Sequence, residues 1–292
     1  MDELTKKKQF LQLQFSLVLL VCSLLPDFEN VFSAALGLGG LSVTVMIARL
    51  IGLGFGGWAL YNFYQSTGGK LPTPFLCGVG GGLVLTLITL IPGTPIWLDY
   101  IALIALIFGI WVCKTSLGIE WRTVSSEGAY LILIACLLNC YHAIDPKITT
   151  SIASLIGLIL YIVGLGKFTQ SLDADGQAGA SKLKIAVWLG IVAAVFGVIP
   201  LLGSIVAGII GIVAFVFEFL GYSALMKSNP LRQQGRDGAK TLRISMIIMV
   251  VATFIGLFST LPTIGTVAGF IALVALWFIY KGWTNILFGL EQ

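Results

Sequence analysis

The sequence predicts an all-α fold, a polytopic transmembrane helical bundle of about ten spans arranged as five tandem helical hairpins. Three observations lead to it: the composition, the length of the apolar runs and a recurring proline. Of the 292 residues, 58% are hydrophobic and 10% are charged, and the mean hydropathy is +1.00. A soluble domain carries about 25% charged residues, so this chain has too few of them to cover a water-soluble particle.

The apolar runs have the length and pattern of membrane helices. They extend over about 17 to 25 residues, which is enough to cross a hydrocarbon core of about 30 Å. A transmembrane β-barrel would instead show segments of about ten residues that alternate polar and apolar side chains. The run "IALIALIFGIWV", which begins at Ile101, does not alternate. The sequence therefore favours helices over strands.

The first hairpin is predicted over residues 9–65. The chain opens with "MDELTKKKQF", three lysines ahead of an apolar run, but lacks the small-x-small site at which a signal peptide is cleaved. We therefore expect an uncleaved first helix. This hairpin is about ten residues longer than the others, and the extra stretch lies within residues 27–48. That stretch is either an amphipathic or re-entrant segment or part of a longer helix.

The other four hairpins are predicted over residues 72–118, 128–170, 181–227 and 240–288. Internal similarity supports them, since "GQAGASKLKI" at 176–185 resembles "GRDGAKTLRI" at 235–244. Prolines recur once per hairpin and end helices because they lack the backbone N–H. A glycine follows at nearly constant distance, as at Gly166, Gly221 and Gly282. The five prolines are Pro26, Pro92, Pro146, Pro200 and Pro262.

The motif P-x-x-G marks two of the predicted hairpin tips, in "PLLGSIVAG" and "PTIGTVAG". In this respect the chain resembles uncharacterised prokaryotic membrane proteins built from tandem helical hairpins. The resemblance covers mainly residues 150–290 and rests on few positions. It implies duplication of a hairpin and implies no activity.

Positive charge predicts the orientation of the chain in the membrane. The N-terminus and the connections between hairpins hold 14 of the 17 Lys and Arg residues, whereas the tips hold only Lys147. Since cytoplasmic segments carry the excess of positive charge, both termini are expected in the cytoplasm. We expect a bacterial inner (plasma) membrane, with anionic lipids at its cytoplasmic face. The net charge of +4 then needs no nucleic acid to explain it.

Glu218 is the first candidate site residue, because it lies inside the apolar run "FVFEFLGYSAL". Its position nine residues before Lys227 places it about 13 Å from the cytoplasmic end of its helix. An ionisable group in a membrane is costly and usually faces a partner or a cavity. Lys281 lies at nearly the same depth in the next hairpin, and Arg49 is the other candidate partner. We weigh three roles for Glu218: an ion pair with Lys281 or Arg49, a proton or cation site, and a carboxylate that faces headgroups or a partner.

A second, weaker candidate is the cluster in "CLLNCYHAID". Cys136 and Cys140 are four residues apart and share a helix face, and His142 and Asp145 follow. The spacing matches neither a zinc knuckle nor a haem attachment site, and buried cysteine commonly behaves as a small hydrophobe. A metal or redox role is one alternative, but no metal or other cofactor is predicted.

The remaining motifs favour a structural interpretation. Small residues four apart, such as Gly52 and Gly56, let helix backbones approach closely. An interfacial aromatic belt explains the aromatic residues near the cytoplasmic helix ends. These are Trp58, Trp111, Tyr222 and Trp283.

No common catalytic motif is present in the sequence, so an enzyme is not favoured. The leading hypothesis is a structural or accessory membrane subunit that contacts lipid, a membrane-protein partner or further copies of itself. The alternative is an ion- or proton-coupled transporter or channel that uses Glu218.

Overall fold

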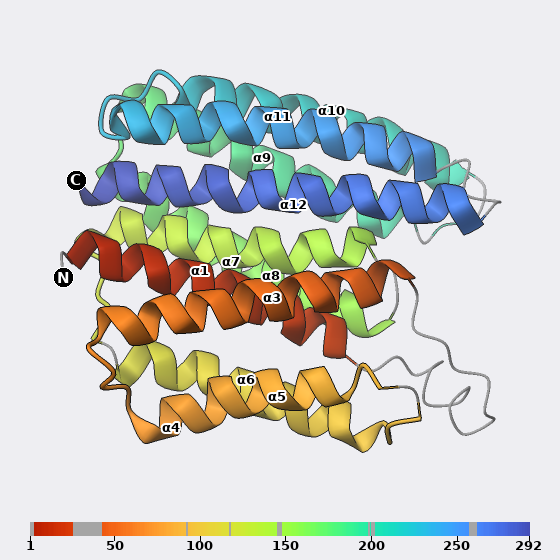
Figure 1. Ribbon diagram of the computed structural model, residues 1–292. Helices are drawn as coiled ribbons and strands as arrows, with labels where there is room; N and C mark the ends of the chain where they lie inside the picture. The colour runs from red at the N-terminus through yellow and green to blue at the C-terminus, as the bar shows by residue number, and fades with distance from the viewer. Residues whose placement is uncertain are drawn as a thin grey trace. The chain divides into compact units, whose positions relative to one another are not determined.

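The computed structural model describes residues 3–25, 43–91, 93–116, 118–144, 148–197, 199, 202–256 and 262–292. Within them every regular element is a helix and no strand occurs, so the predicted all-α class is confirmed (Figure 1). The chain divides into two compact units. The first comprises Met1–Glu120, Leu137–Gly157 and Ala252–Leu273, and the second comprises Trp121–Cys136, Leu158–Val251 and Val274–Gln292.

The first unit contains the N-terminal helices. They are α1 (Glu3–Leu24), α3 (Val43–Ser66), α4 (Thr73–Phe75), the π-helical turn η1 (Leu76–Gly80), α5 (Gly81–Ile88) and α6 (Trp97–Ser116). The backbone stays helical through both ends of η1, so α4, η1 and α5 form one rod. α1 packs against α3 and α6, and α6 runs along the rod. These contacts form two antiparallel helix pairs within this unit.

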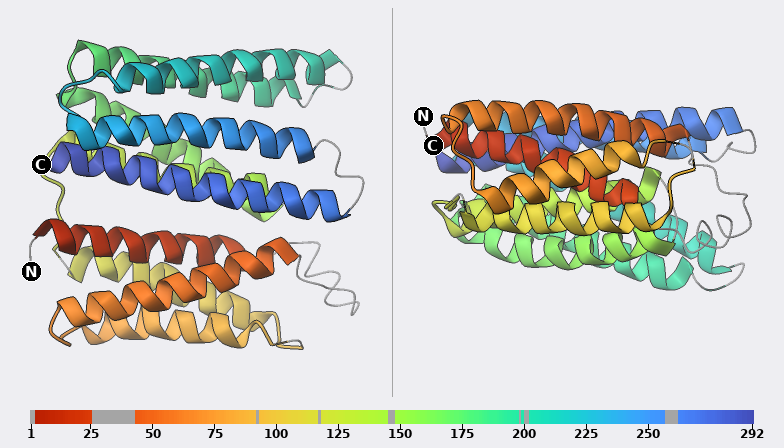
Figure 2. Two further views of the ribbon diagram at one scale, coloured as in Figure 1. Left: turned by 45° about the horizontal axis from the view of Figure 1, so that its top comes forward. Right: turned by 60° about the horizontal axis from the view of Figure 1, so that its bottom comes forward.

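The second unit draws on the C-terminal helices. They are α7 (Val124–Ile144), α8 (Ile148–Phe168), the short 3₁₀ turn η2 (Thr169–Ser171), α9 (Ala174–Gly197), α10 (Leu202–Leu225), α11 (Arg232–Gly256) and α12 (Pro262–Glu291). Parts of α7, α8, α11 and α12 belong to the first unit. α9 and α10 lie antiparallel and in contact along their length (Figure 2).

Six helices are long and apolar enough to cross a membrane: α3, α8, α9, α10, α11 and α12. Three shorter apolar stretches, Thr73–Ile88, Trp97–Val112 and Val124–Cys140, add to them. α10 is the most apolar of the six and the least buried within the structure. The chain is therefore compatible with an integral membrane protein, and the finer prediction of ten spans stays a prediction.

Glycines bring helix backbones into direct contact in the second unit. A Cβ atom added at Gly179 of α9 would lie 2.9 Å from the carbonyl oxygen of Gly221 of α10. The equivalent distance from Gly238 of α11 to the Gly282 oxygen of α12 is 2.5 Å. Gly128 of α7 meets Gly164 of α8 in the same way, at 2.6 Å. A larger residue at any of the three positions would force two backbones apart.

The same aliphatic contact accompanies each glycine crossing. One turn beyond Gly179, the side chain of Leu183 covers Gly221, at 2.8 Å from an added Cβ atom. Leu242 covers Gly282 and Ile132 covers Gly164 at similar distances. The second unit thus uses one packing arrangement three times.

Most of the predicted hairpin tips lie outside the described residues. This holds for Pro26, Pro92, Pro146 and Pro200, and for residues 26–42, which include most of the predicted insertion at 27–48. Pro262 is the first residue of α12. A proline is well tolerated there because the first N–H groups of a helix have no intrahelical partner.

Of the four residues of the predicted aromatic belt, two are exposed, which is compatible with a belt, and two are buried, which contradicts it. Trp58 and Trp111 are exposed, as residues that face lipid headgroups would be. Tyr222 and Trp283 are buried, with exposed fractions of 2% and 0%. Each follows a crossing glycine directly, and the two rings contact edge-on at a centroid distance of 6.2 Å. Sequence position near a helix end therefore did not reveal that these two side chains turn inward.

Candidate functional site

Arg49 is buried in the first unit, with 4% of its surface exposed. Its Nε and Nη2 groups both donate to the backbone oxygen of Ser23, at 3.2 and 2.9 Å. Ser23 lies in the last turn of α1, where carbonyl groups lack intrahelical partners. A cation at this end of a helix is also favoured by the helix dipole. Arg49 therefore caps α1.

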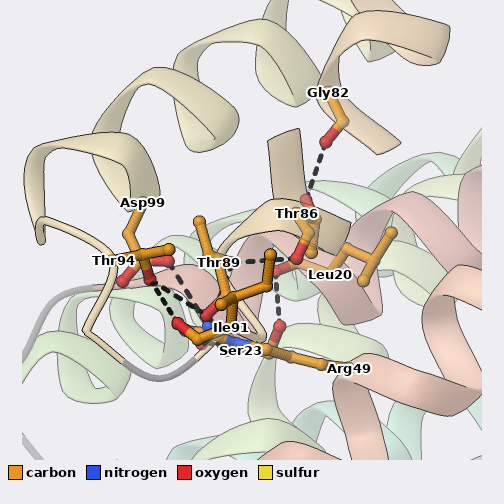
Figure 3. A network of polar contacts seen from close by, with 9 residues as sticks. All are labelled: Leu20, Ser23, Arg49, Gly82, Thr86, Thr89, Ile91, Thr94 and Asp99. Atoms are coloured by element: carbon orange, nitrogen blue, oxygen red, sulfur yellow. Dashed lines mark hydrogen bonds and ion pairs between the residues drawn. The ribbon is translucent and has the colours of Figure 1, made fainter. Parts of the chain in front are cut away.

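The remaining guanidinium nitrogen of Arg49 connects to two other helices (Figure 3). Nη1 donates to the hydroxyl of Thr89 and pairs with the carboxylate of Asp99, both at 3.3 Å. Thr89 is the C-cap of α5, and Asp99 lies in the first turn of α6, where the helix dipole favours an acid. Arg49 of α3 thus joins the ends of α1, α5 and α6.

The Arg49 cluster has the character of a structural clamp. Its positive charge is compensated by Asp99, and its donors point at protein oxygens, which is the condition for holding a charge in a bundle interior. Arg49 was predicted from the sequence as a candidate partner of Glu218, but the carboxylate beside it is that of Asp99. The sequence did contain an indication that Asp99 pairs with Arg49. An acid near a hairpin tip can lie beside an arginine near the start of the neighbouring helix.

Glu218 has a different environment, in the second unit. Its carboxylate accepts a hydrogen bond from the hydroxyl of Tyr222, one turn further along α10, at 3.1 Å. Tyr161 of α8 and Cys136 of α7 lie near Tyr222. Glu218 is half-buried. The result is a small polar cluster contributed by three helices, with one hydrogen bond within α10.

The predicted ion pair between Glu218 and Lys281 does not form among the described residues. Lys281 is exposed, and Arg49 is paired with Asp99. Equal depth along two helices says nothing about the direction in which side chains point. Lys281 precedes Gly282, which faces α11, by one residue and hence by about 100° around the helix. It therefore points away from the bundle interior.

The glycine register also locates Glu218 along the helix axis. Gly221 lies against Leu183, which Lys182 and Lys184 flank in α9. Glu218 precedes Gly221 by three residues, about 4.5 Å along the axis. Its level is therefore within one turn of these two lysines.

The cysteine cluster is described only in part. Cys136 is half-buried and Cys140 is buried, and neither forms a disulfide with another described cysteine. The side chain of His142 and all of Asp145 lie outside the described residues. Among the residues that the structure does describe, no group of three His, Cys, Asp or Glu side chains could hold a metal ion. The cysteine cluster thus stays an untested hypothesis.

Comparison with known proteins adds no activity to this description. No protein family model matches the chain, and no curated protein or solved structure shows a significant match. What the arrangement can do has to be inferred from its own contacts.

Proposed function

We propose that the chain is a multi-pass membrane protein of ten spans in five tandem hairpins, with a structural or accessory role and no catalytic one. The observation that carries this proposal is the way its buried and half-buried polar groups are used. Arg49 ties three helix ends together, and Glu218 bonds to its own helix. Such contacts hold helices in place and leave the outer surface to lipid or a partner.

The three glycine crossings of the second unit support the hairpin arrangement. Each joins two helices that follow one another in the chain, with a glycine in each helix and an aliphatic side chain one turn further on. In the first unit, Gly78 of the α4–α5 rod meets Gly109 of α6 backbone to backbone. Ser16 of α1 meets Gly56 of α3 in a similar way. Five pairs with small residues at the crossing fit a duplicated unit.

Helix length supports the remaining spans. α1, α6 and α7 have 22, 20 and 21 residues, and a helix of about 20 residues covers about 30 Å. The α4–α5 rod is shorter. With the six long apolar helices these elements give ten spans, with both termini in the cytoplasm of a bacterial cell.

Labelling of single introduced cysteines with a membrane-impermeant reagent tests this topology. We expect labelling from the cytoplasmic side at Asp175 and Gly235, and from the opposite side at Asp145 and Leu202. Labelling of Asp175 and Leu202 from the same side would overturn the hairpin arrangement.

Purification in a mild detergent tests the accessory role. We expect one membrane protein to co-purify at fixed stoichiometry, identified by mass spectrometry. A chain that purifies alone, and that moves protons or cations after reconstitution, would contradict the accessory role.

Transport through Glu218 is the second candidate function. Glu218 is favoured here because it has no cationic partner among the described residues, which leaves its carboxylate available to a proton or a cation. Proton and cation flux into proteoliposomes, compared between the native chain and Glu218→Gln, tests it. Equal flux in both would exclude Glu218 from a transport path.

A further inference from the structure

Arg243 of α11 is a half-buried arginine with an unusual environment. Its guanidinium carbon lies 4.2 Å from the centroid of the Phe219 ring on α10. Its Nη1 group lies 3.5 Å from the sulfur of Met226, just beyond the end of α10. Its Nε atom is buried and has no hydrogen-bond partner among the described residues. An aromatic ring and a thioether are thus its neighbours in the chain.

These neighbours do not satisfy a guanidinium group. The group carries five N–H donors, and a thioether sulfur is a weak acceptor. A buried charge is costly unless it is paired and hydrogen-bonded. The aromatic ring compensates part of the charge but accepts none of the in-plane N–H bonds. The geometry of Arg243 therefore calls for an anion.

No carboxylate of the described chain takes this place. Glu218, adjacent to Phe219 in sequence, accepts from Tyr222 instead. Residues 173–243 contain seven cationic side chains against four carboxylates. None of the seven forms an ion pair with another described residue, so the field at this end of α9, α10 and α11 is positive. The seven cations are Lys182, Lys184, Lys227, Arg232, Arg236, Lys240 and Arg243.

We propose that Arg243 binds the phosphate of an anionic phospholipid, with Phe219 and Met226 forming the floor of the site. The inference rests on the proposed membrane placement, in which this end of α10 and α11 lies at the cytoplasmic leaflet. Guanidinium groups bind phosphate oxygens through two parallel N–H bonds. Lys182 and Lys184, at a similar level on α9, add to the attraction for negative headgroups.

The surface next to Arg243 favours a lipid over free phosphate. Large apolar side chains are exposed on both helices from Arg243 toward the opposite helix ends. Those on α10 are Ile212, Val216 and Leu220, and those on α11 are Ile247, Val250 and Val251. Acyl chains can lie along this surface while the phosphate stays at the guanidinium. Inorganic phosphate has no acyl chains and would gain no affinity from this apolar surface.

The test is lipid binding to the delipidated full chain in detergent, measured by native mass spectrometry with phosphatidylglycerol and phosphatidylcholine. The native chain is expected to prefer phosphatidylglycerol, and Arg243→Gln to lower its affinity for that lipid about tenfold, because a charge-assisted pair is lost. Arg236→Gln is the matched control. It removes the same charge from the same helix, but its Nε bonds to the Arg232 carbonyl. An equal effect of both substitutions would overturn the proposal.

A second variant keeps Arg243 and gives it a carboxylate partner from the chain itself. Met226→Glu places a carboxylate beside the guanidinium and should abolish the preference for phosphatidylglycerol, whereas Met226→Gln should retain it. Unchanged lipid preference in Met226→Glu would contradict the proposal, even if Arg243→Gln proved too unstable to purify.

Inorganic phosphate separates the two sources of the anion. We expect millimolar phosphate to leave phosphatidylglycerol binding unchanged. If phosphate displaced the lipid completely, the site would be a free-phosphate site and the lipid assignment would be wrong. Failure here leaves the cysteine-labelling pattern unaffected, so it is distinguishable from failure of the proposed topology.

Discussion

Two arginines, Arg49 in the first unit and Arg243 in the second, show how differently one side chain is accommodated. All three guanidinium nitrogens of Arg49 donate to oxygens of three other elements. Arg243 lies over an aromatic ring beside a sulfur, and its Nε has no acceptor among the described residues. A charge that is fully satisfied inside the chain holds helices together. A charge that is not satisfied inside the chain is available to bind a molecule outside the chain.

The largest expected effect comes from removing the satisfied arginine. Arg49→Met leaves Asp99 without its cation and the Ser23 carbonyl without its donors. Breaking a buried ion pair costs about 3–5 kcal/mol, and we expect about 3 kcal/mol because Asp99 keeps some access to water. The free energy of unfolding in detergent measures it. A loss no greater than that of Arg236→Met would show that Arg49 is not a clamp.

A smaller effect is expected where backbones touch near Arg243. Gly238→Ala puts a Cβ atom 2.5 Å from the Gly282 oxygen, so α11 must move away from α12. Overpacking of this kind costs about 1–3 kcal/mol. Gly190→Ala on α9 is the control, since an added Cβ meets nothing within 4 Å there. Thermal unfolding of the two variants compares them, and equal midpoints would contradict the close packing.

The separation of Glu218 from Lys281 predicts a smaller effect again. Glu218→Gln keeps an acceptor for the Tyr222 hydroxyl, so we expect a loss of about 0.5 kcal/mol or less. Lys281→Met should add to it independently, because residues that do not interact show additive effects. A double-mutant cycle of unfolding free energies tests this. A coupling of about 1 kcal/mol or more would restore the ion pair predicted from sequence.

The smallest effect concerns Asp173, in the connection before α9. The hydroxyl of Ser228 donates to its carboxylate at 2.6 Å, and this bond lowers the pKa of Asp173 below its ordinary value of 3.8. A lowered pKa stabilises the fold at pH values above 3.8, and that contribution is lost as the pH falls further.

Ser228→Ala removes the main cause of this shift. The melting temperature of the variant should therefore fall below that of the native chain near neutral pH, and the difference should shrink below pH 3.8. A difference that does not depend on pH would contradict the role of Asp173.

Helical class and the main candidate residues could be predicted from the sequence, but their partners could not. Composition and run length are sufficient for the class, because few charges cannot cover a soluble surface. Proline and glycine spacing predicted Gly166 as the equivalent of Gly221. The contacts select Gly164 instead, while a Cβ atom at Gly166 would meet open space. Spacing fixes a position to within a turn, and packing decides which residue faces the neighbour.

The partners of the candidate site residues were also not predictable from sequence position alone. Depth alone made Lys281 a partner for Glu218, yet one residue of offset from Gly282 turns its side chain away. Tyr161 could not be found from sequence, because nothing in an apolar run indicates which helix lies beside it. To predict that Arg49 pairs with Asp99, one would have to know how three helix ends lie relative to one another, and tertiary packing decides this.

The glycine crossings have a consequence for the way the protein is made. Each joins two helices that are consecutive in the chain, as Gly179 and Gly221 do for α9 and α10. Contacts between near neighbours in sequence cost the least loop-closure entropy and form early. We expect each helix pair to assemble soon after its second member leaves the ribosome. The order of synthesis would then also be the order of folding.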